Sequence, residues 1–301
     1  AFIRKICVKT AFPWLIFSIP MPITAFSALA CPLDGAPLVR EGMSWRCAHG
    51  HCYDIASQGY THLLPVQHKR SRDPGDSKEM VAARRRFLNA GHYQPIAAAM
   101  SRLALAHLPA NAACLDAGSG EGYYLRQLAA FAEQDGRELA ILGLDISKWA
   151  VQAAAKQDKR PNWVVGSNAK LPVLDGTLDG VLCLFGFPVY PEFARVLRPG
   201  GLLLQIDAGP GHLRQLREII YPSLKPEKPA QNLVPEGFTP AFSESLSFDF
   251  VLQGNEAISD LLAMTPHLFR ASTEGKARAA ALEELALTAE VKLLGWRRGL
   301  G

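Results

Sequence analysis

From about residue 94 to the end, apolar stretches alternate with stretches of helical periodicity. Strands are predicted at 112–116, 140–145, 162–165, 180–184, 202–206, 245–252 and 291–296. One helix is predicted to begin at residue 123, and another is predicted to end near residue 198. Two more are predicted around 256–264 and around 276–287. Strands that alternate with helices favour an α/β domain with a mainly parallel sheet. We therefore predict one Rossmann-like domain with a seven-stranded sheet.

A glycine-rich turn follows the first predicted strand, where residues 116–122 read D-x-G-x-G-x-G. The three glycines are Gly118, Gly120 and Gly122. A nicotinamide-dinucleotide fingerprint would need another glycine at the position of Tyr123. Because glycine lets the backbone approach a ligand closely, the turn could bind a dinucleotide or S-adenosylmethionine, and the missing fourth glycine disfavours the dinucleotide. Asp116 is placed either to organise this turn or to bind the ammonium group of S-adenosylmethionine.

Asp145 ends the second predicted strand, where its carboxylate can accept hydrogen bonds from both hydroxyls of a ribose. An Arg-Pro-Gly-Gly turn at 198–201 precedes the fifth strand. The ordered set of glycine turn, acid and second turn favours a class I, Rossmann-like S-adenosylmethionine methyltransferase domain. The alternative is another α/β fold in which the glycines only make tight turns.

Cysteines and histidines gather between residues 31 and 52, in two short pairs separated by about a dozen residues. This spacing is typical of a zinc knuckle, in which each turn presents two ligands to one tetrahedral ion. The predicted ligands are Cys31, Asp34, Cys47 and His51, and His49 and Cys52 are alternative ligands. Aspartate is a harder ligand than thiolate and weakens a structural zinc site. The alternative is a knuckle remnant in which Cys31 and Cys47 are buried without metal.

The composition, with 49% apolar and 20% charged residues, excludes disordered and fibrous classes. Lys and Arg number 32 and Asp and Glu 28, which gives a net charge of +4. Between residues 65 and 86, seven basic residues face three acidic ones. The seven are Lys69, Arg70, Arg72, Lys78, Arg84, Arg85 and Arg86, and all but Lys78 are predicted to contact RNA. Neutralising phosphates releases counterions, so the segment favours nucleic-acid binding over a merely solvated linker and helix face.

The first thirty residues have some features of a secretory signal peptide but lack an uninterrupted apolar segment. An Ala-Leu-Ala sequence at 28–30 imitates a cleavage site, but Pro13 and Pro20 interrupt the apolar run before it. No stretch reaches the ~18 apolar residues of a membrane span. We expect translation to start at Met21 and residues 1–20 to be a non-native or disordered leader. Six cysteines are too sparse for a disulfide scaffold, which favours the cytoplasm.

Several segments resemble one protein family. The Cys-Pro-Leu at 31–33, the stretches 59–76 and 90–95, and the Gly-Glu-Gly-Tyr-Tyr at 120–124 are similar to the bacterial 23S rRNA guanine-N1 methyltransferases. The similarity is greatest to their Gram-negative type, which acts on guanine 745, and it runs from Cys31 to near the end of the chain. The resemblance implies that a zinc-bearing N-terminal domain and an S-adenosylmethionine domain together form a cleft for a hairpin of 23S rRNA.

The resemblance also implies residue roles and boundaries. The cofactor contacts would be Tyr93, Gly120, Glu121, Asp145 and His212, and the zinc ligands would be Cys31, Asp34, Cys47 and His51. Family members commonly have cysteine at the position of Asp34. The implied parts are residues 21–66 as a zinc-knuckle-like RNA-binding domain, 67–93 as a basic connector and 94–301 as the methyltransferase domain. A homodimer is also compatible with this resemblance.

Single residues have structural alternatives, since Tyr93 could be a core aromatic and His212 a helix-capping residue. Guanine N1 carries a proton that must leave before its lone pair can attack, and no residue is assigned to accept it. Residues 184–190 lack the Asp/Asn-Pro-Pro-aromatic motif of enzymes that methylate exocyclic amines. The aromatic residues of this segment, which could stack on an extruded base or belong to the core, are Phe185, Phe187 and Tyr190.

Two other functions are compatible with parts of this pattern. A small-molecule methyltransferase would share the glycine turn but would have no use for the basic segment. A non-catalytic rRNA-binding assembly protein would need the basic segment but neither an intact turn nor Asp145. Methylation of guanine N1 in 23S rRNA uses both features and is the leading prediction.

Overall fold

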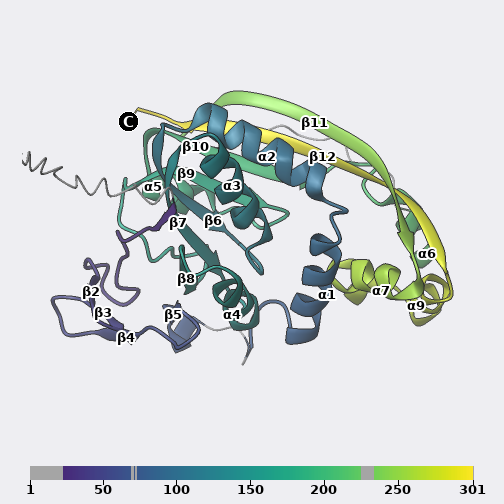
Figure 1. The fold of residues 1–301 in the computed structure, drawn as a ribbon, viewed down its shortest axis with the longest axis horizontal. Helices are drawn as coiled ribbons and strands as arrows, with labels where there is room; N and C mark the ends of the chain where they lie inside the picture. The colour runs from purple at the N-terminus through teal and green to yellow at the C-terminus, as the bar shows by residue number, and fades with distance from the viewer. Residues whose placement is uncertain (1–22, 69–70, 72, 225–233, 301) are drawn as a thin grey trace, which may run out of the picture.

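Figure 1 shows the chain as a computed structural model, which describes residues 23–68, 71, 73–224 and 234–300. The expected leader at 1–20 lies outside the described residues, and so do Lys69, Arg70 and Arg72. Among the helices described, none is long and apolar enough to cross a membrane. The domain boundaries at 66 and 93 stay predictions.

Seven strands form the predicted Rossmann-like sheet in the C-terminal part of the chain. They are β6 (Asn111–Ala117), β7 (Glu138–Asp145), β8 (Asn162–Val165), β9 (Leu178–Leu184), β10 (Leu197–Ala208), β11 (Phe238–Gln253) and β12 (Glu284–Arg298). Their order in the sheet is β11-β12-β10-β9-β6-β7-β8. Five neighbouring strands, in the order β10-β9-β6-β7-β8, are parallel to one another. Strand β12, in contrast, is antiparallel to both of its neighbours, β10 and β11. The parallel strands therefore place their carboxyl ends at one edge, where open α/β sheets bind ligands.

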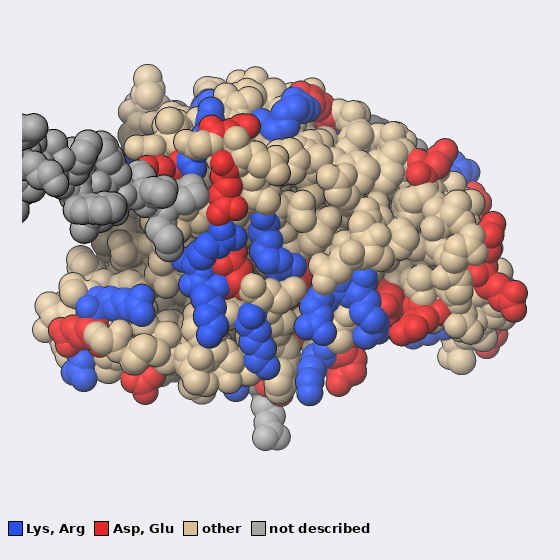
Figure 2. All heavy atoms as spheres, in the orientation of Figure 1, with Lys and Arg blue, Asp and Glu red and all other residues tan. Residues whose placement is uncertain are grey.

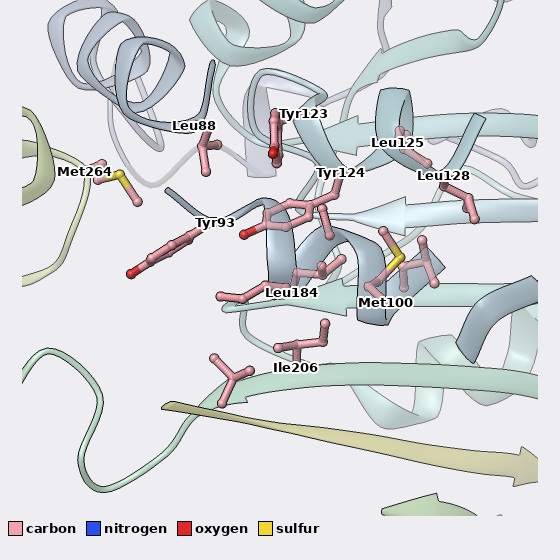
Figure 3. Close-up of a cluster of buried hydrophobic side chains, with 14 of the residues drawn as sticks. Leu88, Tyr93, Met100, Tyr123, Tyr124, Leu125, Leu128, Leu184, Ile206 and Met264 are labelled. Carbon is pink, nitrogen blue, oxygen red and sulfur yellow. The ribbon is translucent and has the colours of Figure 1, made fainter. Parts of the chain in front are cut away.

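Helices cover both faces of this sheet. One face packs against α2 (Gln94–His107), α3 (Tyr123–Gln134) and α4 (Lys148–Gln157), and the other against α5 (Tyr190–Val196). Met100, Leu125 and Leu128 belong to the same buried cluster as Leu184 and Ile206 of the sheet (Figure 3). Each such buried side chain contributes about 1.5–3 kcal/mol, so this layer holds the carboxyl edge rigid. The remaining helical elements are η1 (Val66–His68), α1 (Lys78–Asn89), α6 (Arg214–Ile220), α7 (Asn255–Ala263), α8 (His267–Arg270) and α9 (Thr273–Ala280).

Two short N-terminal strands extend the sheet to nine strands within the described part of the chain. β5 (Tyr60–His62) pairs with β8, and β1 (Ile23–Ala25) pairs with β7. Because β8 covers only the second half of β7, the first half keeps an open edge that β1 fills. Among the strands described, β2 (Val39–Glu41), β3 (Ser44–Arg46) and β4 (Cys52–Asp54) form a separate small sheet. Three-residue strands are too short to show a periodicity, which is why the sequence pattern did not reveal them.

The end of the predicted helix at 276–287 was wrong. Helix α9 stops at Ala280, and β12 begins at Glu284. The burial of Leu285, Leu287 and Ala289 has the period of two expected of a strand with one covered face. Pairing with β11 along fifteen residues of β12 decides the conformation, because a strand in a ladder overrides weak local helix propensity.

Candidate cofactor and metal sites

The four predicted metal ligands meet in one cluster beside the small sheet. One ligand atom from each of Cys31, Asp34, Cys47 and His51 lies within 4.8 Å of all the others. The Nδ1 atom of His51 is 3.5 Å from Sγ of Cys31 and 3.4 Å from Sγ of Cys47. Zinc–sulfur bonds of about 2.3 Å and zinc–nitrogen bonds of about 2.0–2.1 Å imply sulfur–nitrogen edges of about 3.5 Å in a tetrahedron. The cluster therefore fits a tetrahedral zinc ion.

Two tight turns bring these ligands together. The carbonyl of Cys31 accepts a hydrogen bond from Gly35 N–H, and the carbonyl of Cys47 accepts one from Gly50 N–H. Gly35 and Gly50 have φ angles of +78° and +85°, a left-handed conformation that glycine adopts without strain. Each turn thus points two donor atoms toward the same place, as the spacing predicts.

Neighbouring groups prepare the cluster for a cation. The backbone N–H of Ala36, together with the side chains of Cys31 and His49, keeps the pKa of Asp34 below its usual range. Burial raises the pKa of the Cys31 thiol, so a cation is needed to hold it as thiolate. The Tyr53 hydroxyl lies 3.2 Å from the Cys31 sulfur and can donate to it. Cys52, by contrast, is exposed and lies outside the cluster.

The glycine turn lies at the carboxyl edge of the large sheet, between β6 and α3. Its N–H groups at Gly118 and Ser119 donate to the carbonyl of Leu144 at the end of β7. Gly120 N–H donates to the Asp145 carboxylate over 2.9 Å, so the predicted ribose acceptor also fixes the turn. A Cβ atom on Gly122, which has a φ of +82°, would lie 2.6 Å from Trp163. The turn can therefore exist only with glycine at this point.

Asp116 is the least satisfied group of the described residues near this turn. The residue is 1% exposed, and neither carboxylate oxygen has a hydrogen-bond partner in the structure as described. Burial and the nearby charge of Asp145 raise the pKa of Asp116 to about 8. A buried carboxylate without a donor is costly, so the site calls for a cationic donor such as an ammonium group. The turn thus fits S-adenosylmethionine.

The structure brings Tyr93 and His212 together, although 119 positions separate them. Backbone N–H of Glu290 donates to Nδ1 of His212, which leaves the ring proton on Nε2. Nε2 then donates to the Tyr93 hydroxyl over 3.0 Å. Burial lowers the pKa of His212 to about 4, so the ring is neutral at physiological pH. The hydroxyl hydrogen of Tyr93 remains available for an acceptor, which supports a role beyond that of a core aromatic.

The predicted cofactor contact Glu121 uses its side chain inside the protein. Its fully buried carboxylate pairs with Arg126 over 3.1 Å and accepts a 2.6 Å hydrogen bond from Gln157. Only the backbone of Glu121 is left to contact a cofactor.

We expect Glu121→Gln to lower the free energy of unfolding by about 2–3 kcal/mol, because it leaves the partly exposed Arg126 without its counter-ion. Urea unfolding followed by circular dichroism measures this loss. Glu133→Gln serves as a control, since Glu133 forms a more exposed pair with Arg160 and should lose less than about 1 kcal/mol. Equal losses in both variants would contradict a structural role for Glu121.

The three predicted RNA-binding arginines of α1 have different surroundings. Arg84 forms an ion pair with Asp76, and Arg86 forms one with Asp260. Arg85 is exposed and has no partner among the described residues. Figure 2 shows basic side chains gathered in the lower middle of this face, around α1 and α4. These two helices carry exposed Lys78, Arg85, Lys148 and Lys156.

The aromatic residues after β9 separate into three environments. Tyr190 donates to Gln205 and packs against Phe238 and Trp296, so it belongs to the core. Phe187 is 89% exposed. Phe185 is 37% exposed, has a φ of +52° and stacks on Tyr93. Only Phe185 and Phe187 keep a surface for a base.

Sequence reasoning missed Asn168. Its amide donates to the carbonyl of Ala117 over 3.2 Å, while its buried Oδ1 has no partner among the described residues. A polar residue shortly after a strand of a parallel sheet is the signal that could have revealed it, because strand ends face the ligand.

These observations define a class of protein: a methyltransferase domain joined to an N-terminal zinc ribbon. Residues 29–72 match the family described as RlmA, N-terminal, and residues 115–205 match the methyltransferase domain family. A Micromonospora griseorubida protein named as a 23S rRNA (guanine-N(1)-)-methyltransferase is 34% identical over 89% of this chain and 97% of its own length. The chain belongs to the RlmA-type family of 23S rRNA guanine-N1 methyltransferases.

Two further relatives agree with this family. The 23S rRNA (guanine(748)-N(1))-methyltransferase of Streptomyces fradiae is 36% identical over 62% of this chain and 66% of its own length. The Bacillus subtilis protein YxjB, named as a 23S rRNA (guanine-N(1)-)-methyltransferase, is 29% identical over 89% of this chain and 96% of its own length. All three organisms are Gram-positive, so the relatives give no support to the expected Gram-negative type.

Proposed function

We propose that this protein transfers a methyl group from S-adenosylmethionine to N1 of one guanine in 23S rRNA, with zinc bound by the four-ligand cluster. The observation that carries the proposal is the match to the Micromonospora relative along 97% of that protein's length. The glycine turn with its unpartnered Asp116 and the zinc-like cluster support it independently. The proposal places the protein in the cytoplasm with an rRNA hairpin as its partner, and the homodimer stays a prediction.

The residues of the chain position both the cofactor and the guanine in this reaction. S-adenosylmethionine supplies an activated methyl group, so the protein mainly aligns the nucleophile and excludes water. The glycine turn, Asp116 and the Tyr93–His212 pair hold the cofactor end. The guanine must leave its stack before its pairing edge is accessible, and the exposed rings of Phe185 and Phe187 offer a surface beside the cofactor site.

Primer extension along 23S rRNA tests the function. An N1-methyl group blocks the pairing edge, so reverse transcriptase should stop next to the modified guanine. We expect one stop that vanishes when the gene is deleted and returns on complementation, both with the full chain and with residues 21–301. Complementation with Asp116→Asn should fail to restore it.

The position of the stop decides the target. We propose guanine 745, as the resemblance of the sequence implies, whereas the Streptomyces fradiae relative is named for guanine 748. A stop at 748 would correct the position and keep the chemistry. Identical profiles with and without the gene would contradict the rRNA substrate and favour a small-molecule methyltransferase.

A further inference from the structure

Arg84 lies at the cofactor turn, although the sequence groups it with the RNA-binding arginines. It comes from α1, yet its Cδ atom is 3.7 Å from the position that a Cβ atom on Gly120 would occupy. Its Nη2 donates to Asp76 over 2.6 Å and to the carbonyl of Met264 over 3.1 Å. These contacts fix the guanidinium next to the turn, with 27% of the side chain exposed.

The charge of Arg84 acts on the residues that surround this turn. Its positive charge offsets part of the rise that burial causes in the pKa of Tyr93 and of Tyr124, and it favours the ionised form of Asp145. A negative charge on Asp116 acts on Tyr124 in the opposite direction and raises the pKa of that hydroxyl. Arg84, Asp116 and Tyr93 are therefore parts of one site.

Two ionisable groups in this site have atoms without partners. Nε of Arg84 is buried and has no hydrogen-bond partner among the described residues, and the same holds for both oxygens of Asp116. Nearly all buried polar groups in folded proteins are hydrogen-bonded, so each of these calls for a ligand group. Nη2 of the guanidinium already pairs with Asp76, but Nε can still donate to an anion, and a cation beside the Asp116 carboxyl group would hold it in the ionised form. A zwitterion that bridges the turn would satisfy both.

We propose that Arg84 binds the carboxylate of the methionine end of S-adenosylmethionine while Asp116 binds its ammonium group. This inference rests on the proposed function insofar as the cofactor is S-adenosylmethionine. It removes Arg84 from the predicted RNA contacts and leaves Arg85 and Arg86 as the candidates of α1. Arginine suits this task because its guanidinium stays charged and donates several directed hydrogen bonds.

Isothermal titration calorimetry of the full chain with two ligands tests the inference. Decarboxylated S-adenosylmethionine lacks the carboxylate and keeps the ammonium group. The wild type should bind it roughly 10- to 100-fold more weakly than S-adenosylmethionine, as expected for a lost charge-assisted hydrogen bond. Arg84→Met should weaken S-adenosylmethionine by about the same factor and leave the affinity for the decarboxylated ligand within about threefold.

Matched variants separate this role from a structural one. Arg86→Met removes an arginine of the same helix that pairs with Asp260, and it should retain the full preference for the carboxylate. Asp76→Asn loosens the support of Arg84 and should also retain the preference. If Arg84→Met weakens both ligands equally, Arg84 only supports the fold, and the inference is wrong. If it weakens binding of the rRNA hairpin alone, Arg84 is a phosphate contact.

The two proposals fail in different ways. A wild type that binds neither ligand would contradict the use of S-adenosylmethionine itself. A wild type that binds S-adenosylmethionine with the expected preference but leaves 23S rRNA unmodified would contradict only the substrate, and the result for Arg84 would stand.

Discussion

Cys47→Ser is expected to abolish zinc binding and to unfold the small sheet of β2, β3 and β4. These strands have three residues each, and apart from the ligand Cys47 itself, Leu38 and Trp45 are the buried apolar side chains that this segment, residues 38–54, adds to the core beside the large sheet. Such a sheet is marginal without a further constraint. Structural zinc contributes about 10–16 kcal/mol in zinc-finger peptides, far more than this small core can supply.

Atomic emission measures the zinc content per chain. Hydrogen exchange of the amides at 39–54 measures whether the small sheet is folded. We expect one zinc ion per wild-type chain and none in Cys47→Ser, with exchange accelerated only in the small sheet. β1 and β5 pair with the large sheet and should remain protected. Cys52→Ser is the matched control, because Cys52 is exposed and outside the cluster. Equal zinc in wild type and Cys47→Ser would show that the cluster is a remnant.

Asp34→Cys extends the same experiment. A thiolate is a softer ligand than a carboxylate and suits zinc better, so the variant should keep its zinc at higher chelator concentrations than the wild type. The structure already places the Asp34 Oδ2 atom 3.5 Å from the Cys47 sulfur, a spacing that a tetrahedral site accepts. A variant that loses zinc more easily would indicate that the turn is built specifically for the carboxylate.

The second large effect is expected for Asp116→Asn, which should weaken S-adenosylmethionine binding at least about 100-fold, since a neutral amide cannot ionise to pair with the ammonium group. The same substitution should stabilise the protein without ligand. Asp116 has a pKa of about 8 in the fold, against about 3.9 in an unfolded chain. The folded chain therefore keeps a proton that the unfolded chain releases, and the wild type loses stability as pH rises from about 4 to about 8.

Thermal unfolding at several pH values checks this linkage. The stability advantage of Asp116→Asn should grow between pH 5 and pH 8, by up to about 1.4 kcal/mol for each pH unit, and become constant above pH 8. Asp145 is the charged group that acts on Asp116, so Asp145→Asn should reduce the effect without abolishing it. An advantage that does not change with pH would contradict the raised pKa of Asp116.

Short-range chemistry explains why much of the site could be predicted. The glycine turn reads directly from D-x-G-x-G-x-G, because glycine adopts the φ angles of +109°, +55° and +82° found there without strain. The zinc ligands follow from two turns whose spacing presents donor pairs. Both are local devices, in which residues close in the chain act on one ligand.

The sequence by itself determined the order of strands and helices of the Rossmann-like part, the glycine turn and the four-ligand cluster, since periodicity and turn chemistry depend on near neighbours. Only the tertiary structure decided that β1 and β5 complete the large sheet, that residues 284–287 are strand, that Glu121 pairs with Arg126, and that Arg84 reaches the cofactor turn. Each of these depends on the partner that a side chain or strand edge meets after folding. A run of arginines looks alike in the sequence, whereas the groups opposite each one determine whether it binds a neighbour, a cofactor or RNA.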